Sequence, residues 1–275
     1  KTKNANTIIN INNAKPSLIT IANKLADSAR ETILPLFRTD QLNTISKENL
    51  RFDPVTEADK LAELAMRKVL IKNRPDDGII GEEFKNIEGK SGLTWVLDPI
   101  DGTKAFISGT PTWGVLIALS DTEGPFLGII DQPYISERFV GGLGKAWYTG
   151  PQGDKPLKTR SIKNLEEATL FTTFPEVGRH QDYKGFRAVH NRVKLVRYGM
   201  DCYAYALLAA GQIDLVIEAN LQAYDIQAPI AVVEAAGGYV TNWLGAPAHK
   251  GGQAVAASNK ELLKQVVNLL GPFAD

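Results

Sequence analysis

The stretch Trp95–Gly109, with the sequence WVLDPIDGTKAFISG, organises the rest of the chain. It begins inside the apolar run Leu93–Leu97, which is typical of a short buried strand. This strand delivers two carboxylates, Asp98 and Asp101. Pro99 lies between them and fixes its own φ angle, so the turn that presents the two acids is stiff.

Gly102 and Thr103 follow the second acid directly. A glycine lets the backbone approach a ligand closely, and Thr103 can cap a helix over residues 104–107. Two acids beside the N–H groups of a helix start bring a cation site and an anion site together. The stretch therefore suits a divalent metal and a phosphate.

Two other interpretations of the same residues stay open at this point. Asp-Pro and Asp-Gly are common turn sequences, so the stretch can be a plain strand exit. A phosphatase with an aspartate nucleophile carries an Asp-x-Asp-Gly-Thr loop, in which the two acids are two residues apart. Asp98 and Asp101 are three apart, which argues against that class.

The composition indicates that an anionic ligand must be held by local charge. The 275-residue chain balances 31 Lys and Arg residues against 31 Asp and Glu residues, so no overall field favours nucleic acid or an anionic membrane. Every membrane-length stretch is interrupted by charge, Gly or Pro. We therefore expect a small-molecule substrate, bound cations, and neither a nucleic-acid nor a membrane partner.

Cysteine and histidine are too sparse for a thiol or zinc centre. Cys202 is the single cysteine, so an intrachain disulfide is impossible and a reducing compartment is compatible. The three histidines show no paired spacing that would hold zinc or activate a thiol. We expect a cytoplasmic protein. Because the chain does not begin with Met, a removed organellar leader stays open as an alternative.

Hydrophobic periodicity divides the chain into residues 1–150 and 151–275, which we predict to be two subdomains joined at the Gly- and Pro-rich segment Gly150–Pro156. The first half predicts two helices on a largely antiparallel sheet. The second half alternates strands and helices, which favours an α/β arrangement of layers. The predicted helices cover residues 16–38, a segment from 57 onward, 183–190, 202–210, 226–236 and 260–270.

Two further acids of the first half have positions that suit a metal site. Asp53 lies just ahead of a capping-box pattern formed by Thr56 and Asp59, and because the cap does not need Asp53, its carboxylate can hold a water or a metal. Glu82 follows the next predicted strand. If that strand neighbours the one that ends at Asp98, the two carboxylates lie side by side, and such hard oxygen ligands suit Mg²⁺.

Two stretches of the second half also carry charged residues beside a helix start. Arg197 and Asp201 flank Gly199 just before one predicted helix, and Glu218 and Asp225 flank a loop that leads into another. Acids at the end of a strand, or in the loop beyond it, lie where open α/β sheets place their ligands. Helix capping stays an alternative for the two aspartates.

Together these motifs resemble those of the inositol monophosphatase-like superfamily. They occur in the same order as in that superfamily and extend over about residues 50–240. The matching segments are DPVTEAD at 53–59, GEE at 81–83, WVLDPIDGT at 95–103, YD at 224–225 and EAAGG at 234–238. Within the superfamily, the chain is most similar to the histidinol-phosphate phosphatases in the segments GTKAFISG at 102–109, GIIDQP at 128–133 and DCYAYALLAAG at 201–211. The resemblance implies a homodimer with a mixed α+β and α/β fold, a layered αβαβα sandwich of the carbohydrate phosphatase type.

The resemblance also implies the metal ligands, with two or three Mg²⁺ per site. Glu82, Asp98 and the backbone carbonyl of Ile100 would hold one ion. Asp98, Asp101 and Asp225 would hold a second, with Asp98 shared between the two, and Glu82 would also share a third and weaker ion.

The remaining roles follow from the same resemblance. Asp53, Thr103 and Glu82 would serve catalysis, with the first two orienting the water that attacks phosphorus. The N–H groups of Gly102 and Thr103 would bind phosphate oxygens. Paired metals neutralise a phosphomonoester and activate water directly, so no Cys, Ser or His nucleophile is needed.

Substrate choice is expected at the other end of the pocket. Histidinol phosphate carries an ammonium group and an imidazole, and Asp201 and Glu218 can pair with this cationic end, whereas inositol phosphate offers only hydroxyls. Arg197 is a further candidate for substrate contact. The alternatives are inositol-1-phosphate hydrolysis, a broad phosphatase of the same superfamily, and a non-catalytic binding protein that descends from the enzyme.

Overall fold

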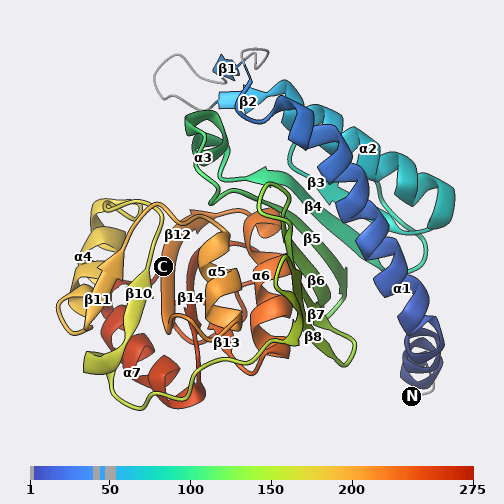
Figure 1. Ribbon diagram of the computed structural model, residues 1–275. Coiled ribbons are helices and arrows are strands. Elements are labelled where there is room, and N and C mark those ends of the chain that lie inside the picture. Colours follow the sequence, from blue (N-terminus) through green and yellow to red (C-terminus); the bar gives the residue numbers. More distant parts are fainter. Residues whose placement is uncertain (1–2, 40–43, 47–53) are drawn as a thin grey trace.

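The computed structural model describes residues 3–39, 44–46 and 54–275. Two β-sheets and three layers of helices alternate through the molecule (Figure 1). Helices α1 and α2 cover the outer face of a seven-stranded sheet, α5 and α6 lie between the sheets, and α4 and α7 cover the outer face of a five-stranded sheet. This arrangement is the predicted αβαβα sandwich.

The seven-stranded sheet has the strand order β3-β4-β5-β6-β7-β8-β9. Its first pair, β3 and β4, is parallel, and every later pair is antiparallel. Gly81 at the end of β3 pairs with Leu97. Glu82 and Asp98 therefore follow side by side, as the sequence predicted. The strands are β3 (Gly78–Gly81), β4 (Thr94–Asp101), β5 (Gly114–Asp121), β6 (Gly124–Gln132), β7 (Glu137–Gly142), β8 (Lys145–Gly150) and β9 (Gly153–Pro156).

The five-stranded sheet has the order β11-β10-β12-β14-β13. Its strands β11, β10 and β12 are parallel, whereas β14 runs antiparallel to both of its neighbours. This mixture matches the alternation of strands and helices in the second half of the sequence. The strands are β10 (Thr169–Phe171), β11 (Leu195–Arg197), β12 (Leu215–Leu221), β13 (Tyr239–Thr241) and β14 (Gly252–Ala257).

The helices cover the faces of these two sheets. They are α1 (Lys3–Ile33), α2 (Glu57–Asn73), α3 (Thr103–Ser108), α4 (His180–His190), α5 (Tyr203–Ala209), α6 (Ala223–Ala235) and α7 (Lys260–Leu270), with 3₁₀ turns at Leu34–Leu36, Leu165–Glu167 and Gly271–Phe273. A small hairpin of β1 (Thr44–Ser46) and β2 (Pro54–Thr56) precedes α2. No helix in the described part of the chain is both long and apolar enough to cross a membrane.

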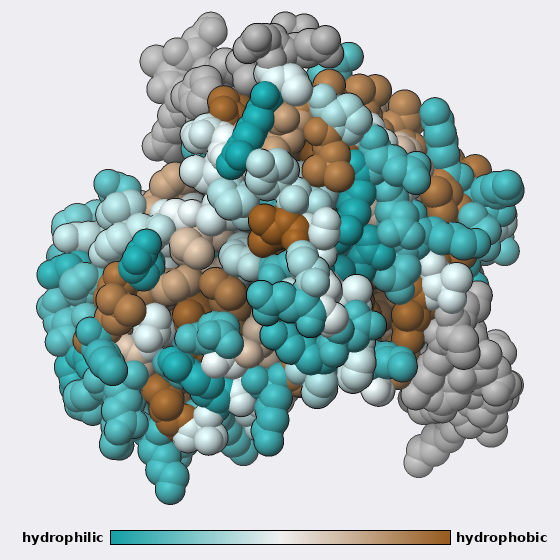
Figure 2. Space-filling view, viewed as in Figure 1, coloured by the Kyte–Doolittle hydropathy of each residue, from teal (hydrophilic) through white to brown (hydrophobic). Residues whose placement is uncertain are grey.

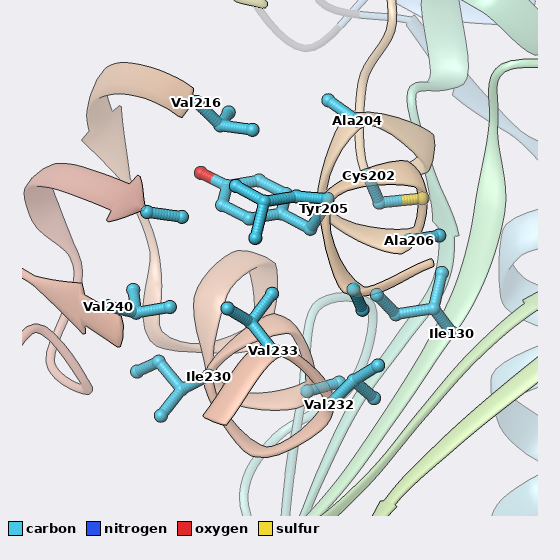
Figure 3. Close-up of a cluster of buried hydrophobic side chains, with 14 of the residues drawn as sticks. Ile130, Cys202, Ala204, Tyr205, Ala206, Val216, Ile230, Val232, Val233 and Val240 are labelled. Carbon is cyan, nitrogen blue, oxygen red and sulfur yellow. The ribbon is translucent and has the colours of Figure 1, made fainter. Parts of the chain in front are cut away.

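The central helix α6 explains how the two sheets are held together. Eight successive residues, 226–233, are buried and all but Gln227 are apolar, as expected for a helix enclosed between two sheets. The sheet side of this contact uses glycines: a Cβ at Gly128 would lie 2.6 Å from the carbonyl oxygen of Ala228. Figure 3 shows side chains of α5 and α6 packed around the ring of Tyr205.

Several element boundaries differ from the sequence prediction, and two of these differences affect the description of the fold. Helix α1 begins at Lys3, well before the predicted residue 16. Hydrophobic periodicity did not predict this first part of the helix, because the polar, Asn-rich start of the chain carries no clear apolar face. Strand β9 extends the first sheet to Pro156, which lies within the predicted boundary segment. The division into two subdomains at residue 150 stays a prediction.

The face seen in Figure 2 is mainly hydrophilic, with hydrophobic residues in small separate groups.

Candidate active site

Three carboxylates from both halves of the chain come together near the C-terminal end of β4. One oxygen each of Asp98, Asp101 and Asp225 lies within 4.8 Å of the others. In a regular strand, residues three apart point to opposite faces. The β4–β5 register shifts between Asp98 and Asp101, and such a bulge re-aims a side chain, so both acids can face the same ligand. Asp225 arrives from the first turn of α6.

The electrostatics of this acid cluster favour a bound cation. Burial raises the pKa of Asp98 well above its usual range, and the charges of Glu82 and Asp101 raise it further. Burial likewise raises the pKa of Asp101, followed by the charge of Asp225. Among the described residues, no hydrogen-bond partner reaches the buried Oδ1 of Asp98. Close carboxylates with an unsatisfied oxygen fit a hard divalent cation.

Asp225 caps helix α6 and also lies in the acid cluster. Its Oδ2 accepts the backbone N–H of Gln222 at 2.6 Å, which completes a capping box at the start of α6. Its carboxylate also belongs to the acid cluster. Burial raises the pKa of Asp225 to about 6, although the Gln222 hydrogen bond lowers it. The cap therefore fixes the direction in which this ligand candidate points.

The turn after β4 brings the predicted phosphate-binding residues to the same place. Gly102 has a φ angle of +84° and precedes Thr103, the first residue of α3. The prediction that Thr103 caps the helix is wrong, because the N-cap is Gly102 and the hydroxyl of Thr103 instead donates to the carbonyl of Ile100 at 3.2 Å. Gly102 adopts a left-handed conformation and is the single residue between the end of β4 and the start of α3, so it takes the N-cap position itself.

Of the predicted catalytic residues Glu82 and Asp53, the structure describes only Glu82. Glu82 is half-buried next to Asp98, whose pKa its charge raises. Asp53 lies outside the described residues, as does the side chain of Thr56. The acid Asp59 is buried on α2, and its charge also raises the pKa of Asp98, so it lies near the acid cluster.

A cavity of about 530 Å³ extends from the acid cluster towards the five-stranded sheet. This volume is typical of small-molecule sites. One wall is formed by β4 and α3, and the rest by the loop after β10, the end of β12 and the start of α5. Its lining includes Asp101, Gly102, Thr103, Lys104, Thr172, Thr173, Phe174, Glu176, Asp201, Tyr205, Glu218 and Asp225.

Asp201 lies against the glycine turn of this cavity. It adopts a left-handed φ of 46°, and Thr112 donates its hydroxyl to Asp201 Oδ2 at 3.1 Å. A Cβ at Gly102 would lie only 2.8 Å from the Cγ of Asp201. Burial raises the pKa of Asp201 to about 6, against the opposing effects of Thr112 and Lys104. Its side chain is not the cap of α5, whose N-cap is Cys202.

Glu218 forms the second acid at this end of the cavity. It lies on β12 and accepts the hydroxyl of Thr173 at 2.5 Å and that of Tyr205 at 2.8 Å. Burial raises the pKa of Glu218 to about 7, although these two hydrogen bonds lower it. In Figure 3 the hydroxyl of Tyr205 points away from α5 towards the strand that carries Val216. Neutral hydroxyl groups thus hold this carboxylate in place.

Arg197 is not brought to the cavity with these acids. It is exposed on the edge strand β11 and is not among the residues that line the cavity. Its backbone carbonyl accepts the N–H of Thr172, so the residue contributes to the sheet.

Sequence reasoning missed several polar residues of the cavity. Thr112, Thr173 and Tyr205 hold the two substrate-end acids, and the hydroxyl of Thr172 is buried without a hydrogen-bond partner among the described residues. Thr112 lies 89 residues from its partner. Threonine and tyrosine carry no motif of their own, so only the spatial proximity of these segments identifies them.

The fold and the cavity define a class of protein: a layered αβαβα sandwich with carboxylates of both halves gathered between its sheets. The chain belongs to the inositol monophosphatase family, whose sequence profile matches residues 15–271. Members of this family are phosphatases.

Individual relatives agree with this assignment. Over 247 residues the chain is 42% identical to the chloroplastic bifunctional phosphatase IMPL2 of Arabidopsis thaliana, covering 86% of this chain and 70% of that protein. Over 241 residues it is 34% identical to the histidinol-phosphatase of Mycobacterium tuberculosis, covering 86% and 92%. An inositol monophosphatase structure from Zymomonas mobilis matches with a TM-score of 0.82 at 37% identity, covering 94% of this chain and 99% of that one.

Proposed function

We propose that this protein is a Mg²⁺-dependent phosphatase that hydrolyses L-histidinol phosphate to L-histidinol and phosphate, a step of histidine biosynthesis. The observation that carries the proposal is the pair of acids formed by the half-buried Asp201 and the buried Glu218, in the same cavity as the acid cluster. A substrate with a phosphate at one end and a positive charge at the other matches this arrangement. The similarity to a histidinol-phosphatase supports it.

The acid cluster is the proposed metal site, with two or three ions. Asp98, Asp101 and Asp225 converge there, Glu82 lies beside them, and the carbonyl of Ile100 adds a fifth oxygen. When bound, Mg²⁺ supplies the positive charge that neutralises a phosphate and lowers the pKa of an attacking water. The bulge of β4 and the cap of α6 fix the directions of these carboxylates, and carboxylate oxygens are the ligands that hard cations prefer.

Other residues of the cavity bind and orient the reactants in this proposal. The N–H groups of Gly102 and Thr103, at the start of α3, receive phosphate oxygens. Asp53 and Thr103, with Glu82, orient the water that attacks phosphorus. Cys202 does not serve as a nucleophile, because burial raises the pKa of its thiol and keeps it protonated.

Recognition of the substrate's cationic end falls to two acids that line the cavity beside the acid cluster. Asp201 and Glu218 each keep a carboxylate oriented by neutral hydroxyl donors. An ammonium or imidazolium group therefore gains a charge-assisted hydrogen bond that a polyol cannot make with equal strength. Arg197, exposed on β11, is a weaker candidate, and it would need to reach the cavity mouth from outside.

The alternative function is inositol-1-phosphate hydrolysis, or a broad phosphatase of the same family. The Zymomonas mobilis structure, named as an inositol monophosphatase, favours it. We also propose a homodimer in the cytoplasm. Sedimentation of the purified protein tests the oligomeric state.

The test compares kcat/KM for L-histidinol phosphate and inositol-1-phosphate in the wild type, Asp201→Asn and Glu176→Gln. Glu176 is an exposed acid at the same cavity, so its variant removes an equal charge without touching Gly102. We expect Asp201→Asn to lower kcat/KM for histidinol phosphate about 10–100-fold, the equivalent of one charged hydrogen bond, and to spare inositol-1-phosphate. Equal losses for both substrates would contradict the proposal.

A further inference from the structure

Helix α2 presents a row of buried charges to the first sheet. Asp59, Glu63 and Arg67 are spaced four residues apart, so they lie on one face of the helix, and their exposed fractions are 1%, 0% and 6%. Charged side chains are rarely buried this deeply unless they have partners. The charge of Asp59 acts on Asp98. The next two residues of the row contact the segment that contains Glu82.

Glu63 and Arg67 together hold the backbone that follows Glu82. Arg67 Nε donates to Glu63 Oε1 at 2.7 Å, and the N–H of Glu83 donates to Glu63 Oε2 at 2.7 Å. A second guanidinium nitrogen of Arg67 donates to the carbonyl of Phe84 at 3.1 Å. The carboxylate thus uses one oxygen for its partner and the other for the backbone.

The same carboxylate also packs against the residue that precedes Glu82. A Cβ at Gly81 would lie 2.1 Å from Glu63 Oε1 and 2.5 Å from its Cδ. Only a glycine leaves room for this contact. The buried pair Glu63–Arg67 therefore touches the chain on both sides of Glu82.

This segment needs such support for a physical reason. Strand β3 ends at Gly81, and residues 82–84 form bends without regular pairing. Glu82 lies beside Asp98, and like charges in a buried site repel each other until a cation is bound. A short irregular segment would relax away from its negative neighbours if nothing fixed its backbone.

We propose that the pair Glu63–Arg67, with Gly81, is a positioning device that holds the Glu82 carboxylate beside Asp98 for Mg²⁺ binding. The inference rests on the proposed function, in which Glu82 is a metal ligand. Groups that orient metal ligands from outside the coordination sphere typically change metal affinity 10–100-fold when they are removed. Neither Glu63 nor Arg67 touches substrate in this account.

A buried ion pair at the other end of β3 provides a matched control. Asp77 is 3% exposed and accepts Arg74 Nε at 2.7 Å, Ser91 Oγ at 2.7 Å and Trp95 Nε1 at 2.8 Å. It stabilises the same strand by the same type of interaction, but it does not contact residues 81–84. Asp77→Asn therefore reports the loss of a buried ion pair alone.

The experiment measures the Mg²⁺ dissociation constant by calorimetry, and the melting temperature, for the chelator-treated full chain. The variants are Glu63→Gln, Gly81→Ala, Glu82→Gln and Asp77→Asn. We expect Glu63→Gln and Gly81→Ala to weaken Mg²⁺ binding about 10–100-fold and Glu82→Gln to weaken it at least as much. Asp77→Asn should lower the melting temperature and leave Mg²⁺ affinity within about twofold of the wild type. If Glu63→Gln does not fold, Arg67→Lys replaces it, because lysine keeps the charge but loses the fork that reaches both Glu63 and Phe84.

The outcomes separate this inference from the proposed function. Wild-type affinity in the Glu63 and Gly81 variants, beside weakened binding in Glu82→Gln, overturns the positioning role and leaves the metal assignment intact. Wild-type affinity in Glu82→Gln overturns Glu82 as a ligand, and the positioning role with it. A loss in Asp77→Asn equal to that in Glu63→Gln also overturns the positioning role, since general destabilisation would explain both.

Discussion

The cavity contains two acidic regions that differ in how their charges are satisfied. In the acid cluster, Asp101 accepts the backbone N–H of Cys202, Asp225 accepts that of Gln222, and Asp98 keeps a buried oxygen with no hydrogen-bond partner among the described residues. In the adjoining region, Asp201 and Glu218 accept hydroxyl groups from threonine and tyrosine side chains. One region is thus crowded by like charge, whereas the other is held by neutral side-chain donors.

This difference indicates which ligand each region takes. Crowded carboxylates raise one another's pKa values, and a multivalent cation relieves that repulsion. Carboxylates oriented by hydroxyl groups keep a fixed direction, and a hydrogen-bonding cation of the substrate would stabilise the charged form that burial disfavours in Asp201 and Glu218. We therefore assign the metal to the first region and the organic cation to the second.

Asp98→Asn should have the largest effect, because it removes the most central charge of the acid cluster. Since groups outside the coordination sphere already change activity 10–100-fold, we expect loss of a direct ligand to lower phosphate release at least about 100-fold at fixed Mg²⁺. Asp131→Asn is the control: Asp131 is equally buried on β6 but pairs with Arg30 and Arg138. Full Mg²⁺-dependent turnover in Asp98→Asn would contradict the metal assignment.

The stability of the metal-free protein should fall as pH rises. Asp225 has a pKa raised to about 6 by burial, above its unfolded value of about 3.9. Its contribution to stability is therefore complete below about pH 4 and is lost as pH rises through 6, a change of at most about 3 kcal/mol.

Melting temperatures of the wild type and Asp225→Asn, in chelator at pH 5 and pH 8, measure this contribution. The variant keeps an oxygen for the Gln222 N–H but loses the charge. We expect its melting temperature relative to the wild type to be higher at pH 8 than at pH 5, and Mg²⁺ to remove that advantage. An equal difference at both pH values would be inconsistent with charge repulsion in the cluster.

Gly102→Ala should damage the contact between the two acidic regions. The added Cβ would lie 2.8 Å from Asp201 Cγ, and the positive φ strains an alanine by about 1 kcal/mol. Gly92→Ala is the matched control, because Gly92 has a φ of +83° and a Cβ there would meet no atom within 4 Å. We expect both variants to lose stability, but only Gly102→Ala to lose about tenfold or more in kcat/KM. Equal activities would show that the collision has no consequence for the site.

Thr112→Val should have the smallest effect. It removes the 3.1 Å hydrogen bond to Asp201, worth about 1 kcal/mol, so KM for L-histidinol phosphate should rise about fivefold with little change in kcat. Thr32→Val is the control, since the hydroxyl of Thr32 donates instead to the carbonyl of Ser28 on α1 at 2.8 Å. An equal rise in KM for inositol-1-phosphate would argue that Thr112 shapes the cavity without affecting selectivity.

Much of the fold was predictable because it depends on local patterns. The alternation of strands and helices in the second half predicted the α/β layers, and the apolar run before Asp98 predicted β4. The neighbouring positions of Glu82 and Asp98 followed from the assumption that consecutive strands pair, which the parallel β3–β4 register confirms. The resemblance gave the layered sandwich, and the family comparison agrees with it.

The details that were not predictable depend on contacts between distant segments. The bulge between Asp98 and Asp101 depends on pairing with β5, and the Thr112–Asp201 contact joins residues 89 apart. The cap predicted at Thr103 was wrong because the local pattern did not indicate the left-handed φ of Gly102. The roles assigned to Asp53 and to the substrate-end acids stay predictions.

The most direct test of the account is phosphate release by the wild-type protein at saturating Mg²⁺, with L-histidinol phosphate and inositol-1-phosphate compared under identical conditions. We expect a kcat/KM at least about tenfold higher for L-histidinol phosphate, the value of one charge-assisted hydrogen bond, and no release from either substrate in chelator. A preference for inositol-1-phosphate would contradict the assignment of Asp201 and Glu218 to a substrate cation.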